Sequence, residues 1–441
     1  METCQASRSP QGLSVANRSD NICVHRVGNG IMMLCWGNRR SGTDLLFLRM
    51  LTAALLAWPT TGALPATESE QRTSRTIRVG EDYPVKTIAA AARLAQDGDI
   101  IEITAGDYVG DTAVWTQTDL QIRGINGRPR LIAEGKAAEE KGIWVIRGGD
   151  ILVENIEFTG ARVANRNGAG IRFERGKLKI RKCVFTDNEN GMLVGNDPSM
   201  ILEIEDSEFG DNGAGDGQSH NLYVGTIERL VVQGSYFHHA RVGHLLKTRA
   251  RENFIYYNRL TDEPGGRASY ELEFPVGGLA FVVGNLIEQG EKTENPTIIS
   301  FGAEGYKWSR NDLYLSHNTI VNDKLEGGVF ILARPGSAYV KALNNVLVGK
   351  GDLDLKTRAD IGQNWRLDRS EFVFPEGFDF RLKPDSQAAG AADEPGEAMG
   401  VSLRPTREYS YRIGTELLPL ATSFSPGAFQ TRTRKNDPAL P

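Results

Sequence analysis

A short motif of polar and apolar positions recurs along the middle of the chain. Each copy is a residue that is most often small or an amide, then any residue, then a large apolar residue. The eight copies begin at Ile156, Cys183, Ser207, Ser235, Asn258, Asn285, Asn318 and Asn345. Successive copies lie 23 to 33 residues apart, which indicates an internal structural repeat.

A second register lies three and five residues before each motif. Fifteen of its sixteen residues are apolar, and Asn253 is the exception. The pairs are Ile151/Val153, Leu178/Ile180, Leu202/Ile204, Leu230/Val232, Asn253/Ile255, Ala280/Val282, Leu313/Leu315 and Val340/Ala342. A spacing of two residues points both side chains of a pair to one face of a strand, so each pair predicts one buried strand face.

These intervals decide the fold class. Hairpins reverse the chain within a few residues, whereas strands separated by 23 to 33 residues can stack in parallel when the chain coils in one direction. Polar residues between the apolar ones exclude a doubly wound sheet. Sandwich strands recur every ~8–12 residues and propeller blades every ~40–45. The sequence therefore predicts an all-β, single-stranded, right-handed parallel β-helix.

Both ends of the repeat carry segments suited to covering a solenoid. Residues 87–95 form a short alanine-rich pattern that predicts a capping helix, and Asp97-Gly98-Asp99 follows it. An apolar strand at residues 100–103 and the segment Phe378 to Ser386 complete the two ends. These blocks resemble the N-terminal cap, first rung and closing segment of the pectate-lyase-like β-helix superfamily. The resemblance covers roughly residues 76–392, which we assign to the β-helix domain.

The flanking segments have different compositions. Residues 1–66 contain Arg39 and Arg40, a short apolar run interrupted by Arg49 and Pro59, and small residues up to Ala66. This pattern predicts a secretory signal, and hence a secreted or periplasmic protein, and the run is too short for a stable membrane span. The first 30 residues suggest an over-long start. Residues 393–441 are predicted to be a partly disordered extension.

The amino-acid composition and net charge limit the kinds of binding partner that we expect. The net charge of −5 provides no overall basic field, which argues against nucleic acid as a partner. Three of the four cysteines precede the predicted fold, so Cys183 has no partner for an internal disulfide and is expected to be buried. The 49 glycines predict many tight turns. We expect a monomer that acts on an anionic polysaccharide.

Candidate chemistry lies on the outer face of three consecutive predicted rungs. If Leu222, Leu246 and Leu272 point inward, then Tyr223, Lys247 and Glu273 share one outward column with steps of about 4.8 Å. Asn221 and Glu271 are expected to point outward beside them. His220, Arg241, His244, Arg249, Arg251 and Glu304 are expected near this column.

Part of this segment resembles the chondroitinase-B and alginate-lyase-like β-helix family. Lys247-Thr248, followed by Asn253-Phe254-Ile255-Tyr256-Tyr257-Asn258-Arg259-Leu260, is similar to the family's lysine rung. The resemblance implies that Lys247 is the base that removes the C5 proton of a uronic acid. Where the family places its arginine, this chain has Glu271 to Pro275, so Lys247 is the last residue to which the resemblance assigns a role.

The residues allow a coherent β-elimination. Lys247 would be the base, and Tyr223 or His244 the acid, with Glu273 completing the catalytic set. Arg249 and Arg251 could neutralise the substrate carboxylate. Alternatively, a cation could do so, and the oxygen ligands Glu271, Glu273 and Glu304 suit Ca²⁺. We expect Arg241, His220 and Asn221 to contribute to substrate binding.

Three functions stay open at this point. The first is a polysaccharide lyase or a related C5 epimerase. The second is an inverting glycoside hydrolase, because Glu271 and Glu273 would have Cα atoms about 6.6 Å apart on one strand. The third is a non-catalytic carbohydrate-binding or export β-helix, in which Lys247 and Glu273 form only a surface ion pair.

Overall fold

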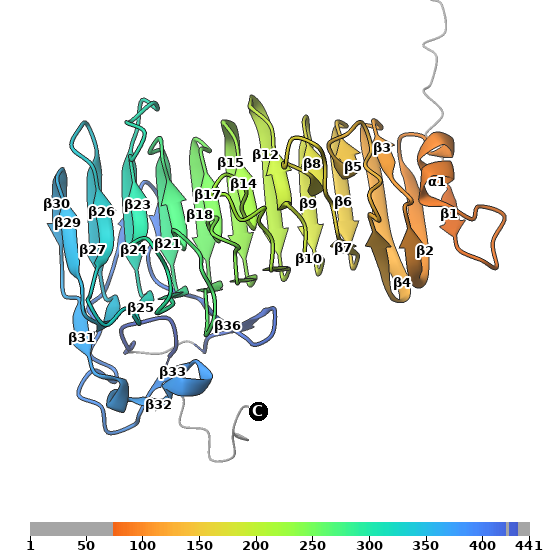
Figure 1. Cartoon of the computed structure of the whole chain (residues 1–441). Coiled ribbons are helices and arrows are strands. Elements are labelled where there is room, and N and C mark those ends of the chain that lie inside the picture. Colours follow the sequence, from red (N-terminus) through yellow and green to blue (C-terminus); the bar gives the residue numbers. More distant parts are fainter. Residues whose placement is uncertain (1–73, 420–422, 431–441) are drawn as a thin grey trace, which may run out of the picture. The chain divides into compact units, whose positions relative to one another are not determined.

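The computed structural model describes residues 74–419 and 423–430, which belong to one compact unit beginning at Glu70. The predicted secretory segment at residues 1–66 lies outside the described residues. Strands make up almost all of the regular structure and form a parallel β-solenoid of about 10 turns (Figure 1). The predicted right-handed parallel β-helix is confirmed.

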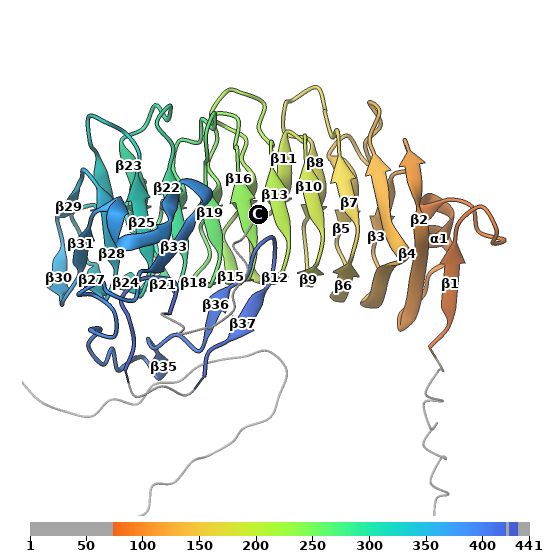
Figure 2. The same cartoon turned by 90° about the horizontal axis from the view of Figure 1, so that it is seen from below.

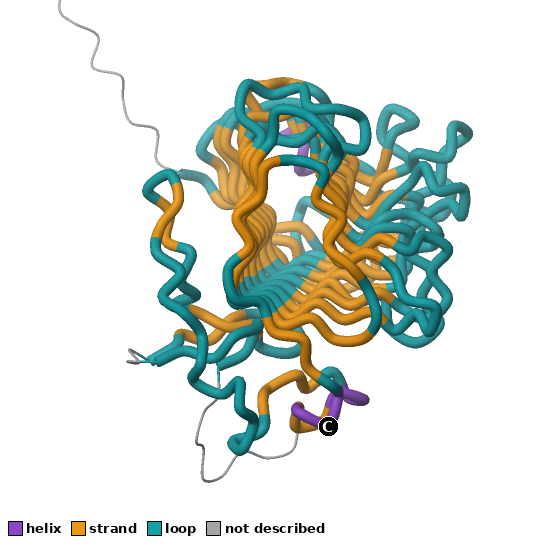
Figure 3. Tube along the Cα trace, turned by 90° about the vertical axis from the view of Figure 1, so that its left-hand side faces the viewer, coloured by secondary structure: helices purple, strands orange, loops and turns teal. Residues whose placement is uncertain are grey.

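Most turns of the solenoid contribute one strand to each of three stacked columns, which superimpose when viewed along the stack (Figure 3). The first column contains β1 (Thr76–Val79), β2 (Asp99–Val109), β4 (Asp119–Ile132), β6 (Asp150–Glu154), β9 (Lys177–Arg181), β12 (Asp197–Glu205), β15 (Ile227–Gln233), β18 (Glu252–Tyr256), β21 (Leu279–Val283), β24 (Asp312–Ser316), β27 (Tyr339–Leu343) and β30 (Arg358–Ile361). All pairings in this column are parallel.

The second column carries the recurring motif. It contains β7 (Glu157–Thr159), β10 (Val184–Thr186), β13 (Glu208–Gly210), β16 (Tyr236–His238), β19 (Arg259–Thr261), β22 (Leu286–Gln289), β25 (Thr319–Asn322), β28 (Val346–Gly349) and β31 (Trp365–Leu367). The long strand β4 pairs with both β6 and β7, which joins the first two columns into one sheet of 21 described strands.

The third column forms a separate sheet of ten described strands. It contains β3 (Ala113–Trp115), β5 (Gly142–Ile146), β8 (Ala169–Phe173), β11 (Asn190–Val194), β14 (Leu222–Val224), β17 (Leu246–Thr248), β20 (Leu272–Phe274), β23 (Thr297–Phe301), β26 (Val329–Ala333) and β29 (Asp352–Leu355). This sheet positions the candidate site, because β14, β17 and β20 carry the outward column expected from the sequence.

The predicted apolar register is the observed one. Leu202 and Ile204 pair with Leu230 and Val232, and every other predicted pair aligns in the same way with its neighbours. The large apolar residues of the motif also stack. Phe185 and Phe209 lie with ring centroids 4.6 Å apart, and Phe209 and Phe237 lie 4.8 Å apart. These side chains belong to one buried core along the solenoid.

The amide residues that begin the later motifs form a ladder inside the bend between the first two columns. The Asn258 side chain donates to Asn285 Oδ1 at 3.0 Å and to the Val232 carbonyl at 2.9 Å. The side chains of Asn285 and Asn318 repeat both bonds one rung further on. These asparagines have a structural role, because they satisfy backbone groups of successive turns.

The N-terminal end is capped as predicted by a short helix, α1 (Ile88–Leu94). The Thr87 hydroxyl accepts a bond from the Ala90 N–H, and Asp111 accepts from the first two helical N–H groups. Both contacts satisfy donors that a helix leaves free at its first turn. Within the described residues, no helix has the length and apolar character needed to cross a bilayer.

After β31 the chain folds back along the solenoid. It forms η1 (Arg369–Glu371), β32 (Phe372–Phe374), η2 (Pro375–Gly377), β33 (Asp379–Leu382), β34 (Glu397–Ala398), β35 (Val401–Ser402), β36 (Arg407–Tyr409) and β37 (Thr415–Leu417). Strand β33 lies beside β22, β25 and β28 (Figure 2). Apolar side chains of β32 and β33 pack on the outer faces of those three strands. Leu403 packs on Phe281, Tyr314 and Leu343 of the first column.

Candidate functional site

Strand pairing places Tyr223, Lys247 and Glu273 at equivalent positions on three successive rungs, as the sequence predicts. Tyr223 pairs with Lys247, and Lys247 pairs with Glu273. The residues on either side of each belong to the buried interior, so the middle side chain of each three-residue strand points away from the core. We call the group around these three residues the lateral site.

Lys247 is the centre of the charged contacts in the lateral site. Its Nζ lies 2.9 Å from Glu273 Oε2 and 3.7 Å from Glu304 Oε1. Glu273 Oε2 also lies 3.2 Å from His244 Nε2. The contacts to Glu273 Oε2 have hydrogen-bonding distances but not hydrogen-bonding angles, so Lys247 and Glu273 form an ion pair rather than an aligned hydrogen bond.

Arg249 links the phenol of the site to its most exposed acid. One guanidinium nitrogen donates to the Tyr223 hydroxyl oxygen, and another donates to Glu304. The guanidinium carbon also lies 5.1 Å from the centroid of the Tyr223 ring, which is a cation–π distance. Because Arg249 donates to the phenol oxygen, the phenol keeps its own proton available for another acceptor.

Two histidines stack behind the column. The rings of His220 and His244 are 4.3 Å apart at their centroids, and His220 also stacks on Tyr223 at 5.4 Å. His220 Nδ1 accepts from the His244 backbone N–H at 2.9 Å, and His244 Nδ1 accepts from the Tyr270 backbone N–H at 3.2 Å. Each neutral ring therefore carries its proton on Nε2.

Burial sets the charge of these groups. Burial lowers the pKa of His220 well below its ordinary value, and nearby His244, Lys247 and Arg249 lower it further. Burial also lowers the pKa of His244, although Glu273 opposes the shift. For Glu273, burial raises the pKa, but His244 and Lys247 together outweigh it, so the pKa falls below its ordinary value. The site thus presents neutral imidazoles and an ionised carboxylate at neutral pH.

The expected outward orientation of Asn221 and Glu271 is wrong. Asn221 is buried, accepts from the Asn212 amide at 2.9 Å, and donates to the His238 carbonyl at 2.8 Å. Glu271 is also buried, and Asp262 and Glu288 are the charged groups near it. The strict alternation holds only within strands β14 and β20, whereas both residues precede those strands at the bend. Asn221 is structural, and Glu271 cannot pair with Glu273 in a hydrolase.

Of the other residues predicted for the site, some belong to the lateral site and others pair with acids elsewhere. Glu304 and Arg249 belong to the lateral site, whereas Arg241 pairs with Asp187 at 2.8 Å and Arg251 pairs with Glu228 and Glu252. The proposed ligands of a cation are also divided, because Glu271 lies apart from Glu273 and Glu304. Within residues 74–419 and 423–430, no group of three or more His, Cys, Asp or Glu has metal-binding geometry.

The structure adds two residues to the lateral site. Tyr270 contacts the His244 ring at 5.0 Å and occupies the position equivalent to His220 and His244 on the next rung. Its spacing of 26 residues from His244 is a signal in the sequence that the same register argument could have used. Trp308 donates to the Arg249 carbonyl at 3.3 Å from a loop, where no strand register applies.

Comparisons with known proteins support no assignment by sequence. No protein-family model matches the chain, and no curated protein sequence matches it. Among solved structures, pectate lyase Pel9A is 12% identical with a TM-score of 0.49, over 82% of this chain and 98% of that one. Geobacillus virus E2 ORF18 is 13% identical with a TM-score of 0.41, over 61% of this chain and 53% of that one. The functional argument therefore rests on the lateral site.

Proposed function

We propose that the lateral site binds an anionic polysaccharide and cleaves it by β-elimination at a uronic acid. The observation that carries this proposal is that the Lys247 amine, the Arg249 guanidinium and the Tyr223 phenol come together on two successive rungs. β-Elimination uses a group that neutralises the substrate carboxylate, a base at C5 and an acid at the leaving oxygen. The three side chains match these requirements one for one.

Arg249 is suited to the carboxylate. It is paired with Glu304, whose side chain is 40% exposed and lies at the open side of the site. A substrate carboxylate in place of Glu304 would form the same type of charged contact with the guanidinium. Neutralising that carboxylate stabilises the negative charge that develops when the C5 proton leaves.

Lys247 and Tyr223 are suited to the two proton transfers. The unprotonated Lys247 amine would accept the C5 proton, and the electron pair of that bond would form the C4–C5 double bond. The C4–O4 bond then breaks, and the Tyr223 hydroxyl would protonate the departing oxygen. Arg249, which already donates to the Tyr223 oxygen, would stabilise the resulting phenolate. A C5 epimerase would share the first transfer and return a proton to C5 instead.

One observation favours binding without catalysis. Lys247 is held between Glu273 and Glu304, and an ion-paired ammonium is a good ligand for sugar carboxylates but not a base. On this second proposal the lateral site retains a polysaccharide without changing it.

The test uses purified protein and a panel of uronic-acid polymers, with ultraviolet absorbance of the unsaturated product as the readout. Lys247→Ala should reduce turnover at least about 10²-fold, which is the scale of general-base loss. The matched control is Lys179→Ala. Lys179 lies on β9, outside the lateral site, and it also pairs with an acid, because its Nζ lies 2.7 Å from Glu205 Oε1. This control should retain full turnover.

The outcomes separate the alternatives. Polymer binding that Lys247→Ala weakens, without any product, would support the binding proposal and contradict the lyase. New reducing ends without unsaturated product would indicate hydrolysis. Proton exchange at C5 without chain cleavage would indicate the epimerase.

A further inference from the structure

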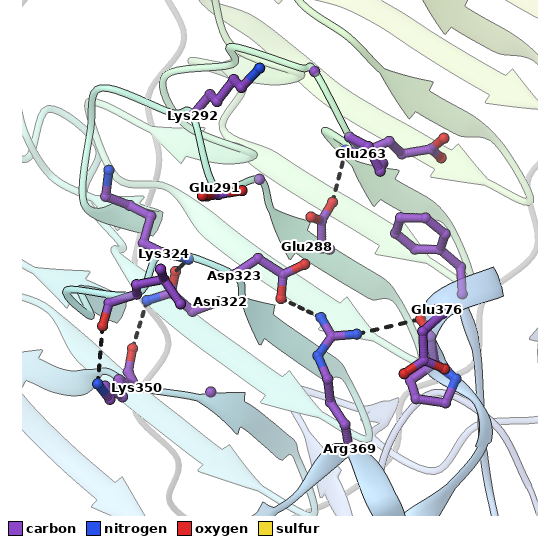
Figure 4. Close-up of a pocket in the computed structure, with 17 residues that line it drawn as sticks. Glu263, Glu288, Glu291, Lys292, Asn322, Asp323, Lys324, Lys350, Arg369 and Glu376 are labelled. Atoms are coloured by element: carbon purple, nitrogen blue, oxygen red, sulfur yellow. Dashed lines mark hydrogen bonds and ion pairs between the residues drawn. The ribbon is translucent and has the colours of Figure 1, made fainter.

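A second site lies away from the lateral site, where the C-terminal segment folds back on the solenoid. A pocket of about 780 Å³ is lined by the turn after β22, the turn after β25, and residues of the segment from Arg369 to Phe378 (Figure 4). None of the lateral-site side chains lines it. An inference about this pocket is therefore independent of the proposed elimination.

Most basic side chains of the pocket already have partners. Lys324 donates to the Thr293 carbonyl at 2.6 Å, and Lys350 donates to the Leu325 carbonyl at 3.1 Å. Arg369 is ion-paired with Asp323. Each of these three side chains is thus held by a contact within the protein, whereas Lys292 on the exposed rim is the basic lining residue without a partner in the described part of the chain.

The acidic side chains of the pocket have fewer hydrogen-bond and ion-pair partners. Glu288 is 1% exposed, and its carboxyl group accepts one hydrogen bond, from the Glu263 backbone N–H at 2.9 Å. Its other oxygen has no partner among the described residues. Figure 4 shows this carboxyl group between Glu263 and Asp323. Glu291 and Glu376 also line the pocket and make no ion pair with any described residue.

Glu288 is surrounded by other acids. Burial raises its pKa to about 8, and the neighbouring carboxylates of Asp323, Asp262 and Glu263 contribute to the increase. The Asp262 carboxyl behind it has one buried oxygen without a hydrogen bond. A buried acid without a cation is a costly arrangement, so the pocket is better suited to a positive ligand than to an anion.

We propose that this pocket binds a small organic ligand through a primary ammonium group. Among the described residues, no group of three or more His, Cys, Asp or Glu has metal-binding geometry, so the proposal is an ammonium rather than a metal ion. Phe378, Pro264 and Pro375 supply apolar wall for the carbon part of such a ligand. The ammonium would donate to Glu288, and the ring of Phe378 is of the type that attracts cations.

The proposal predicts a pH dependence that follows from Glu288. An ammonium pairs with the ionised carboxylate, and an alkylamine stays protonated up to a pH of about 10. Affinity for the amine should therefore rise as pH approaches 8 and level off above it, with release of a proton on binding. Asp262, Glu263 and Asp323 face Glu288, Glu271 is a further acid near it, and these groups would shift the midpoint of this pH dependence.

Calorimetric titration with hexylamine, using hexanol as the neutral isostere, tests the ammonium requirement. Hexylamine should bind and hexanol should not. Glu288→Gln keeps an acceptor for the Glu263 N–H and should weaken hexylamine binding about tenfold or more, the effect of losing one charged hydrogen bond. The matched control is Glu294→Gln, because Glu294 lies on the turn after β22, is 71% exposed at its side chain and is outside the pocket lining; this variant should bind normally.

Two further probes identify the source of the ammonium. Tighter binding of glucosamine than of N-acetylglucosamine would indicate an amino sugar, and tighter binding of spermidine would indicate a polyamine. Equal binding of hexylamine and hexanol, binding of Ca²⁺ in place of amines, or unchanged hexylamine binding in Glu288→Gln would each overturn the proposal. Thermal unfolding of Glu288→Gln separates a loss of binding from a loss of fold.

Discussion

At the scale of single residues, Glu271 is a buried carboxyl group, whereas the sequence pattern predicts it on the outer face. Burial raises its pKa well above its ordinary value, and Asp262 and Glu288 raise it further. Neither of its carboxylate oxygens has a hydrogen-bond partner. A carboxyl group with a raised pKa holds its proton in the folded state at a pH where the unfolded chain has lost it.

The direction of this pKa shift predicts how the stability of the protein depends on pH. The stability contribution of Glu271 is complete below its unfolded pKa near 4.5 and is lost as pH rises toward the folded pKa. Glu271→Gln removes the titrating group at nearly constant volume. The melting temperature of the variant should fall less than that of the wild type between acidic and alkaline pH. Parallel curves for the two proteins would show that Glu271 is not the group concerned.

The same residue shows where sequence reasoning ends. Period-two alternation placed Tyr223, Lys247 and Glu273 correctly, because each is the centre of a three-residue strand. It misplaced Asn221 and Glu271, which differ from those residues only by standing before the strand, where the backbone bends. Loop residues such as Trp308, and the pocket beside Glu288, depend on long-range packing, which a local repeat does not encode.

At the scale of elements, the asparagine ladder fixes the bends of the solenoid. The Asn258 amide donates to Val232 and Asn285, and its oxygen accepts from the Ser235 N–H at 2.9 Å. All of these groups are buried, so removing the amide leaves several of them without partners. In the sequence, these asparagines recur at one offset from the apolar register, which places them at the same bend of successive rungs.

Asn258→Ala should therefore destabilise the protein by about 2–4 kcal/mol, the penalty for a few buried groups left unsatisfied. The control is Asn196→Ala, because Asn196 also accepts a backbone N–H, from Thr226 at 2.8 Å, but is exposed. Urea unfolding followed by far-ultraviolet circular dichroism measures both. Equal losses in the two variants would contradict a special role for the ladder.

At the scale of the whole described unit, the C-terminal segment acts as a clamp on the solenoid. Arg412 pairs with the buried Glu208 of β13, and the Thr406 N–H donates to the Tyr257 hydroxyl at 3.0 Å. The Gly427 N–H donates to the Asn344 carbonyl at 2.9 Å. These contacts span several rungs of the solenoid, whereas the buried core along its interior is built from residues before this segment.

Because the interior core does not include the C-terminal segment, loss of contacts from this segment should destabilise the β-helix without unfolding it. Leu403 is fully buried against Phe281, Tyr314 and Leu343, so Leu403→Ala should cost about 2–4 kcal/mol, the usual range for a buried leucine. Leu417→Ala is the control, because Leu417 is 70% exposed, and it should leave the stability unchanged.

Deleting residues 393–441 should lower the melting temperature, retain the β-sheet signal and increase binding of a hydrophobic dye at the uncovered outer faces. A deletion variant with no cooperative transition would instead make the segment part of the folding unit itself.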